Sequence, residues 1–188
     1  MSETASPNRR PIGVLVLGLG NVLLGDDGLG GAAIARLEAR FATPSGVRLA
    51  DGGTLGLALL GLFADAEHVV IVDAIRAEAA PGSPIRLAGE DVAAAVRDRL
   101  SPHQVGVADL LDAARLIDRY PDSVTLLGLV PDSLDLRVGR STAVEAGLGK
   151  LVDCIAAEVR RLGYPMLPRP VEATDHAAAA DFARYFGM

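Results

Sequence analysis

The chain has 188 residues, a formal net charge of −6 and a mean hydropathy of +0.32, and half of its residues are hydrophobic. This length and composition suffice to bury one ordinary core and exclude disorder for most of the chain. The acidic balance, without a dense basic patch, argues against nucleic acid or an anionic membrane as a partner. A single cysteine, Cys154, excludes an internal disulfide and a cysteine-only zinc site, and it indicates a reducing, cytoplasmic location.

Residues 1–10 are polar and are expected to form a mobile leader. The longest charge-free stretch, residues 11–25, is shorter than the roughly 20 apolar residues that span a bilayer, so no membrane insertion is expected. The Asn8-Arg-Arg triplet ahead of an apolar run resembles a twin-arginine or secretory signal. Because the Asp26-Asp27 pair stands where a small-residue cleavage site would lie, we expect the protein to remain in the cytoplasm.

Apolar runs broken by turn residues predict alternating strands and helices in a single domain over residues 11–163. The expected strands are Ile12–Leu17, Val47–Ala50, His68–Asp73, Pro84–Leu87 and Val124–Val130. The expected helices are Gly31–Phe41, Leu55–Phe63, Asp91–Leu100, Val107–Tyr120 and Ser141–Leu162. This alternation favours an α/β fold with a mostly parallel, twisted sheet of about five strands and helices on both faces.

Local signals refine several of these elements. Pro84 lacks the backbone N–H that a central strand donates to its neighbour, so its short strand is expected at an edge of the sheet. At an edge this strand could run antiparallel. Thr54 stands in an N-cap position ahead of the second helix. Ser141 followed by Glu145 resembles a capping box at the start of the last helix. Residues 164–188 match no usable pattern and are assigned to a C-terminal tail.

Acidic residues fall where the binding crevice of an open α/β sheet is expected, beyond the carboxyl ends of the strands. Asp27 lies in the loop after the first strand, and Asp51 and Asp73 end the second and third strands. Such carboxylates are expected to reach one crevice. With an imidazole they would form a metal site of mixed oxygen and nitrogen ligation, with positions open for water or substrate. His103 lies in a proline-marked loop, whose side of the sheet the sequence leaves open.

Each of these residues also has a purely structural interpretation. The Asp26-Asp27 pair would cap the following helix, and Asp51 before two glycines would shape a turn. Asp73 is harder to explain in this way, because a carboxylate at the end of a buried strand needs a partner. On spacing alone, His103 is an ordinary histidine.

Two other functions are disfavoured. Gly18-Leu-Gly20 resembles the start of a dinucleotide-binding fingerprint, but Leu23 replaces its third glycine. The Asp26-Asp27 pair just before the helix would also repel a pyrophosphate. Nucleophilic catalysis has little support, because the sequence has no G-x-S-x-G elbow and Cys154 occupies a core-like position in the last helix.

Five sequence blocks occur together and in order between about Ile12 and Leu162. They are Gly18-Leu-Gly-Asn-Val-Leu-Leu-Gly-Asp-Asp27-Gly-Leu-Gly30, Asp51-Gly-Gly-Thr54, His68-Val-Val-Ile-Val-Asp-Ala74, Ser101-Pro-His-Gln-Val-Gly106 and Val130-Pro-Asp-Ser133. Each block alone is weak, but the combination resembles the hydrogenase maturation endopeptidases, cytoplasmic proteases that process the large subunit of nickel–iron hydrogenases. The Ser-Pro-His-Gln block is similar to the branch that serves membrane-bound uptake hydrogenases.

The resemblance implies a single cut that removes a C-terminal extension from the large-subunit precursor after nickel insertion. The family's metal-contacting acids fall on Asp27 and Asp73, and its histidine falls on His103. The aspartate of its D-G-G-T motif falls on Asp51, which would act either as the base or as a loop scaffold. The positions of these acids at strand ends single them out without the resemblance, whereas His103 owes its role to the resemblance alone.

The resemblance leaves the mechanism open. Asp27, Asp73 and His103 would engage nickel that the substrate's cysteines already hold, and an activated water would attack the peptide carbonyl. A permanent catalytic zinc is the rival mechanism. The alternative function is a non-catalytic, nickel-sensing chaperone of the large subunit, which would use the same ligands. The apolar segment Leu55–Phe63 is a candidate docking surface for either function, although such spacing is more often core.

Overall fold

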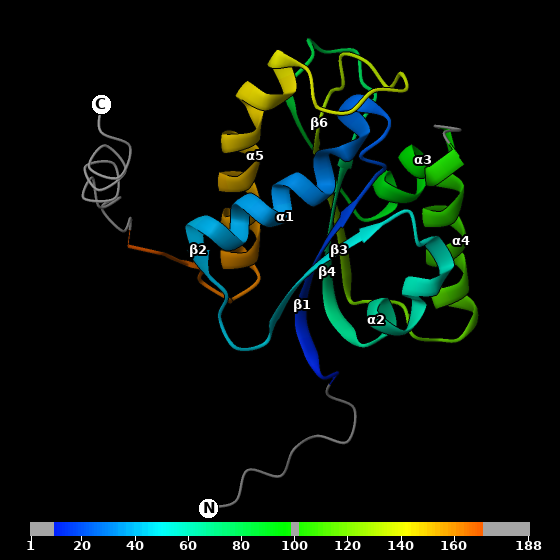
Figure 1. The fold of residues 1–188 in the computed structure, drawn as a ribbon. Coiled ribbons are helices and arrows are strands. Elements are labelled where there is room, and N and C mark those ends of the chain that lie inside the picture. Colours follow the sequence, from blue (N-terminus) through cyan, green and yellow to red (C-terminus); the bar gives the residue numbers. More distant parts are fainter. Residues whose placement is uncertain (1–9, 99–101, 171–188) are drawn as a thin grey trace, which may run out of the picture.

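A five-stranded sheet runs through the centre of the computed structural model, which describes residues 10–98 and 102–170 (Figure 1). The strand order is β3-β1-β4-β6-β5, and only the edge strand β5 is antiparallel to its neighbour. The strands are β1 (Ile12–Leu19), β3 (Val47–Gly53), β4 (Ala66–Ala74), β5 (Pro84–Ala88) and β6 (Ser123–Leu129). The α/β class, the mostly parallel sheet and the edge position of the proline-led strand are thereby confirmed.

Helices cover both faces of this sheet, and the chain forms three layers (Figure 1). One face carries α1 (Leu29–Arg40) and α5 (Thr142–Arg161), and the other carries α2 (Leu60–Ala64), α3 (Glu90–Asp98) and α4 (Pro102–Leu116). Two short 3₁₀ helices, η1 (Gly25–Gly28) and η2 (Gly56–Leu59), precede α1 and α2. None of the helices in the described residues is long and apolar enough to cross a bilayer.

The two cores follow from the alternation of side chains along the central strands. In β1, Val14 and Val16 pack into the cluster beneath α1 and α5, whereas Leu15 and Leu17 pack into the cluster beneath α2, α3 and α4. All four side chains are fully buried, and burial of each one contributes about 1.5–3 kcal/mol. A strand buried on both faces has no polar side, which explains its continuous apolar sequence.

The segment Leu55–Phe63 differs from the single helix that was expected. Gly56 has a φ of +52° and starts the short helix η2, and α2 begins only at Leu60. The N-cap of η2 is Leu55 and makes no side-chain capping hydrogen bond, so the expected N-cap role of Thr54 is wrong. A β-carbon on Gly56 would lie 3.3 Å from the Cα of Gly106, so the absence of a side chain lets η2 approach α4 closely.

Helix α4 begins earlier than expected, at Pro102, and ends at Leu116. Proline is compatible with the first helical turn, where an N–H group has no partner within the helix. His103 therefore lies in the first turn of a helix and not in a loop. The expected loop around His103 is therefore wrong from Pro102 onward, where the chain is helical.

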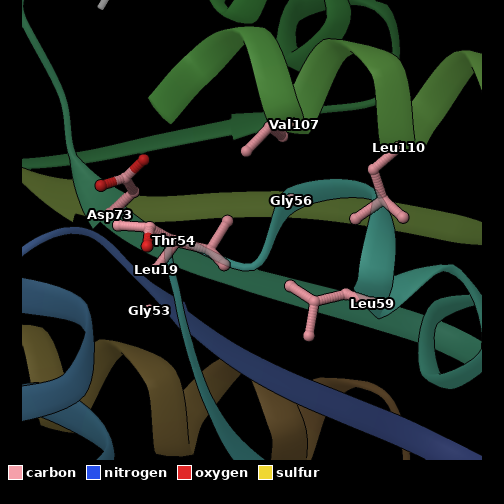
Figure 2. Close-up of a pocket in the computed structure, with 8 residues that line it drawn as sticks. All are labelled: Leu19, Gly53, Thr54, Gly56, Leu59, Asp73, Val107 and Leu110. Carbon is pink, nitrogen blue, oxygen red and sulfur yellow. The ribbon is translucent and has the colours of Figure 1, made fainter. Parts of the chain in front are cut away.

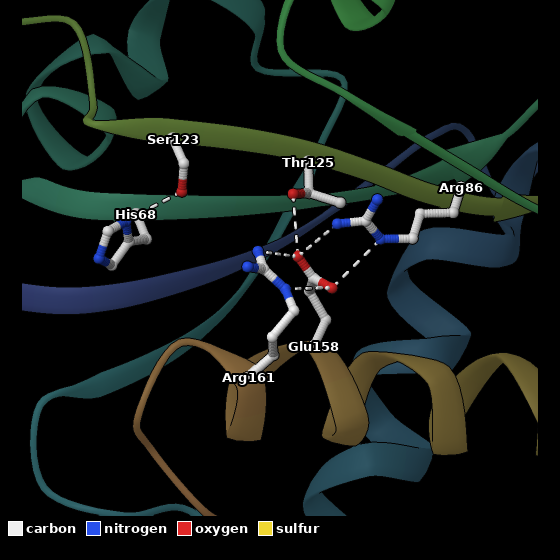
Figure 3. Close-up of polar contacts among 6 residues, drawn as sticks. All are labelled: His68, Arg86, Ser123, Thr125, Glu158 and Arg161. Atoms are coloured by element: carbon white, nitrogen blue, oxygen red, sulfur yellow. Dashed lines mark hydrogen bonds and ion pairs between the residues drawn. The ribbon is translucent and has the colours of Figure 1, made fainter.

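A buried carboxylate joins α5 to the far edge of the sheet (Figure 3). Glu158 accepts hydrogen bonds from Arg86 of β5 at 3.0 and 3.2 Å, from Arg161 at 2.7 and 3.2 Å, and from the hydroxyl of Thr125 at 3.1 Å. Burial alone would raise the pKa of Glu158, but these donors outweigh it and lower the pKa to about 2. The carboxylate thus fastens α5 to the edge strand as a charged, fully bonded group.

The described end of the expected tail packs against the domain. Met166 is buried beneath α1 and α5, and Tyr164 packs against the same cluster. β7 (Leu167–Pro168) pairs with β2 (Phe41–Ala42) in a second, two-stranded sheet. The remainder of the expected tail, residues 171–188, and most of the expected leader, residues 1–9, lie outside the described residues.

Candidate active site

The carboxyl-terminal ends of β1, β3 and β4 lie at the same edge of the sheet, and each end or the loop that follows it carries one of the expected acids. Asp27 lies in η1, Asp51 near the end of β3 and Asp73 near the end of β4. In the sheet register, Gly18 of β1 pairs with Asp51 on one side and with Val72 on the other. Asp51 and Asp73 therefore end their strands at nearly the same level.

Asp51 and Asp73 nevertheless face opposite sides of the sheet. Asp73 alternates in step with Ile71, which packs beneath α2, α3 and α4, whereas Asp51 alternates in step with Leu49, which packs beneath α1 and α5. The Asp51 carboxylate accordingly lies over Gly31 in the first turn of α1. Asp51 and Asp73 thus lie at the same edge of the sheet but on opposite faces of it.

Asp73 lines a small cavity between the strand ends and α4 (Figure 2). The cavity measures about 10 Å³, enough for about one water molecule. It is lined by Leu19, Gly53, Thr54, Gly56, Leu59, Asp73, Val107 and Leu110. Most of these side chains are apolar, so the Asp73 carboxyl group faces surroundings of low polarity.

The surroundings of Asp73 favour its neutral form. Its side chain is 7% exposed, and Oδ1 accepts a hydrogen bond from the N–H of Ala74 at 2.7 Å. Burial and, to a smaller extent, the nearby carboxylate of Asp27 together raise the pKa of Asp73 to about 7, against the opposing effect of the Ala74 hydrogen bond. Two close carboxyl groups, one of them with a pKa near neutrality, are a frequent property of proton-transfer and cation sites.

Asp27 is the buried partner of Asp73, held by the loop that follows β1. Its Oδ2 accepts a hydrogen bond from the backbone N–H of Asn21 at 2.7 Å. Gly20, with a φ of +122°, passes so close that a β-carbon there would collide with the carbonyl oxygen of Asp27. The N-cap of α1 is Gly28, so Asp27 is not the helix cap that its position suggested.

Asp26 has a different role from its neighbour. It is 0% exposed, and its carboxylate accepts hydrogen bonds from the N–H groups of Ser141 at 2.6 Å, Asp132 at 2.8 Å and Ser133 at 3.2 Å. Burial alone would raise the pKa of Asp26, but these backbone donors outweigh it and lower the pKa. Asp26 therefore ties the turn that carries Asp27 to the loop after β6 and to the start of α5.

Asp51 is exposed and shapes the turn at the end of β3. Its Oδ1 accepts a hydrogen bond from the N–H of Gly53 at 3.0 Å, and Gly53 has a φ of +47°. Asp51 also lines an open cleft of about 280 Å³, whose other lining residues are Gly20, Asn21, Val22, Gly28, Gly31, Gly53 and Thr54. Gly53 and Thr54 separate this cleft from the Asp73 cavity, because both residues line each of them.

The structure brings Asp27 and Asp73 together, while the position of the His103 side chain lies outside the described residues. Within the residues that the structure describes, no three His, Cys, Asp or Glu side chains are grouped closely enough to hold a metal ion. Two carboxylates alone supply only part of a coordination shell, so the remaining ligands of any bound cation would come from elsewhere.

Comparison with known proteins decides the family. The model of the hydrogenase maturation proteases matches residues 32–158, and the hydrogenase 2 maturation protease of Escherichia coli is 40% identical over 83% of this chain and 96% of its own length. The chain belongs to the hydrogenase maturation protease family. The hydrogenase expression/formation protein HupD of Rhodobacter capsulatus is 37% identical over 83% of this chain and 74% of its own.

Solved structures of maturation proteases share the fold described above. The hydrogenase maturating endopeptidase HybD of E. coli matches with a TM-score of 0.80 and 39% identity, over 84% of this chain and 98% of its own. A nickel–iron hydrogenase maturation protease HybD from Thermococcus kodakarensis matches with a TM-score of 0.64 and 30% identity, over 79% of this chain and 99% of its own. The chain is thus an endopeptidase of this family, as the sequence blocks indicated.

Asp26 is the residue of this protease that sequence reasoning interpreted least well. Its partners lie 106 to 115 residues away, in the Val130-Pro-Asp-Ser133 block and at the N-cap of α5. The N–H of Ser141 goes to Asp26, whereas Glu145 pairs with Arg36 and Arg140, so the capping box is only half formed. The block that contains Asp26 and the Val130-Pro-Asp-Ser133 block are both recognisable in the sequence. Neither block by itself indicates that the two are in contact.

Proposed function

We propose that this maturation protease removes the C-terminal extension of a nickel–iron hydrogenase large-subunit precursor after nickel has been inserted, in the cytoplasm that its single cysteine favours. The observation that carries the proposal is the buried carboxyl pair of Asp27 and Asp73 beside a small cavity. Such a pair is costly to bury while both groups are charged, because each destabilises the ionised form of the other. A cation that arrives with the substrate would remove this cost.

The cation in this proposal is the nickel that the precursor already holds through its cysteines. Asp27 and Asp73 would contribute oxygen ligands, and His103, in the first turn of α4, would contribute a nitrogen ligand. The Asp73 cavity is lined by Val107 of the same helix, one turn beyond His103, which supports a shared location. Contact with the metal would restrict cutting to finished precursors, because a metal-free precursor cannot satisfy the carboxyl pair.

In the cutting step, a water molecule adds to the carbonyl carbon of the scissile peptide bond. A carboxylate of the pair accepts the proton of that water, and the same proton passes to the leaving amine as the C–N bond breaks. We assign this step to Asp73, because its carboxyl group lines a cavity that holds about one water molecule. A permanent zinc at the same residues is the rival proposal.

The contacts of Asp51 support the scaffold role over the role of base. Its carboxylate holds the turn at Gly53, and this turn forms the wall between the open cleft and the Asp73 cavity. The Asp51 side chain also faces α1, away from the side of the sheet on which Asp73 lies. We therefore assign Asp51 to positioning the loop and the carboxyl pair to the chemistry.

The experiment that tests the proposal replaces Asp73 by Asn and follows the mass of a nickel-loaded precursor. Asn keeps the acceptor for the Ala74 N–H but supplies neither a charge nor a base. We expect loss of cleavage with the fold retained, while the control Asp153→Asn, which changes an exposed aspartate on α5, cleaves like wild type. Normal cleavage by Asp73→Asn would refute the assignment.

The same experiment separates a protease from a chaperone. A chaperone that senses nickel through the same residues would form a stable complex with the precursor and leave its mass unchanged. A protease shortens the precursor. A chelator added to the enzyme alone, and removed before substrate is supplied, distinguishes nickel presented by the substrate from a resident zinc, since only a resident metal would be lost at that stage.

A further inference from the structure

Exposed aliphatic side chains gather on the loops around the site. Of the large hydrophobic side chains that are exposed in the described part of the chain, most belong to the segments after β1, β3 and β6. These side chains, which we call the apolar rim, are Val22, Leu23, Leu55, Leu57, Leu136 and Val138. All three segments follow the carboxyl ends of parallel strands, at the same edge of the sheet as Asp27 and Asp73 (Figure 1). Exposed apolar side chains that gather at one end of a molecule are candidates for an interaction surface, unlike single residues scattered over the whole surface.

The loops that carry the rim are held in place by the backbone. The N–H of Arg137 donates to the carbonyl of Leu23 at 2.9 Å, and the N–H of Gly25 donates to the carbonyl of Arg137 at 2.9 Å. Leu24 and Arg137 form an isolated parallel bridge, and the Asp26 carboxylate binds the N–H groups at the start of the same loop. The loops that carry Val22, Leu23, Leu136 and Val138 are therefore fixed relative to one another, which lowers the entropic cost of binding.

The rim is continuous with the site. Val22 lines the open cleft together with Thr54, and Thr54 also lines the Asp73 cavity. Leu55 and Leu57 follow Thr54 directly in the chain, while Leu136 and Val138 flank Arg137, which is bonded to the Val22 loop. A polypeptide bound in the cleft would contact Val22 and would lie next to the loops that carry the other rim side chains.

We propose that the apolar rim is the docking surface for an apolar segment of the hydrogenase precursor that flanks the bond to be cut. This inference rests on the proposed function. The rim side chains have no hydrogen-bonding groups, so they recognise a partner only by removing apolar surface from water. An aliphatic segment of the substrate protein meets this requirement, and the tied loops hold it next to the carboxyl pair.

The test removes apolar surface at the rim without touching the site. In the double variant Leu136→Ser and Val138→Ser, both side chains are more than 80% exposed, at 81% and 83%, so the fold should keep its melting temperature. The matched control is Leu116→Ser, because Leu116 is 88% exposed and lies at the end of α4, outside the rim. Cleavage of nickel-loaded precursor is measured as KM and kcat for wild type and both variants.

We expect the rim variant to raise KM at least about tenfold while kcat is unchanged, since it removes binding that is equal in the ground state and the transition state. The control should match wild type in both constants. Equal KM values for all three proteins would overturn the docking proposal while leaving the proposed function intact, because wild type still cuts. If wild type does not cut, the proposed function has failed instead.

Size-exclusion chromatography of the same proteins tests the competing occupant, a second copy of this chain. If wild type associates and the rim variant is monomeric with an unchanged KM, the rim serves self-association and the proposal is wrong. If wild type and the rim variant elute alike and only KM differs, the precursor is the occupant.

Discussion

Asp51 and Asp73 hold equivalent positions near the ends of two strands of the central sheet, yet their surroundings differ. Asp73 faces an apolar cavity beside a second carboxylate, and its pKa is raised to about 7 by burial and by Asp27. Asp51 is exposed and bonds the backbone of its own turn. Successive side chains along a strand point to opposite faces of the sheet, so a shift of one residue moves a side chain to the other face. Asp51 and Asp73 differ by such a shift.

Replacement of Asp51 separates a scaffold from a base. Asn keeps an oxygen that accepts from the Gly53 N–H, so Asp51→Asn should cleave within about threefold of wild type, whereas Asp51→Ala loses this bond and should lower kcat/KM about tenfold. Steady-state cleavage of nickel-loaded precursor measures both. A loss of about 10² or more in Asp51→Asn would instead identify Asp51 as the base.

Asp73 makes the free enzyme less stable as the pH rises. Its folded-state pKa of about 7 lies above the ordinary value of 3.8, so the folded state binds more protons than the unfolded state between these values, and stability falls as pH rises through that window. Asp73→Asn removes this loss. We expect the unfolding free energy of Asp73→Asn, relative to that of wild type, to increase from pH 5 to pH 8. The increase is about 1.4 kcal/mol for each unit by which the pKa of Asp73 is raised within this pH range. Denaturant titrations of the metal-free proteins measure this increase, and a constant difference would show that Asp73 titrates normally.

At the scale of elements, single side chains fasten segments that are remote in sequence. Asp26 joins η1 to the loop after β6 and to α5, and Glu158 joins α5 to β5 and β6. Both carboxylates are buried and fully charged, and donors hold the pKa of each below its ordinary value despite burial. Each therefore stabilises the fold only while its donors stay in place.

Glu158→Gln tests the second of these connections. The pKa of Glu158 is about 2 in the folded state, below the ordinary 4.5, so its contribution is complete above pH 4.5 and is lost as the pH falls toward 2. Because both arginines are about half exposed, we expect a loss of only about 1–3 kcal/mol at pH 7, shrinking at pH 3. Urea unfolding at the two pH values measures it. Glu145→Gln, in an exposed ion pair on the same helix, should change stability by less than about 1 kcal/mol, and an equal effect of both variants would contradict the role of Glu158.

At the scale of the whole molecule, the sequence predicts those features of the fold that depend on short stretches of neighbouring residues. The buried strand His68–Asp73 carries four consecutive β-branched residues, and Pro84 excludes a central position for its own strand. The fold class, the layers and the edge strand therefore follow from the sequence alone. The left-handed Gly56 and the helix start at Pro102 were missed, because glycine and proline each permit more than one local structure. The faces of Asp51 and Asp73 depend on the register of β3 and β4 against β1, which long-range packing sets.

The apolar rim and the carboxyl pair lie at the same edge of the sheet, so the groups proposed for binding and for catalysis are at one end of the molecule. The loops there are positioned by the rigid layers beneath them, as in other open α/β proteins. The opposite end carries the β4 to β6 pair of His68 and Ser123, joined at 2.9 Å, and takes no part in the proposed reaction (Figure 3).

The central claim is that cutting depends on nickel in the substrate. The most direct measurement is the intact mass of the large-subunit precursor, nickel-loaded and nickel-free, before and after incubation with this protein. We expect loss of a C-terminal fragment from the nickel-loaded precursor alone. Cleavage of both precursors at equal rates would contradict the role assigned to Asp27 and Asp73. An unchanged mass in both, with a stable complex, would show a chaperone in place of a protease.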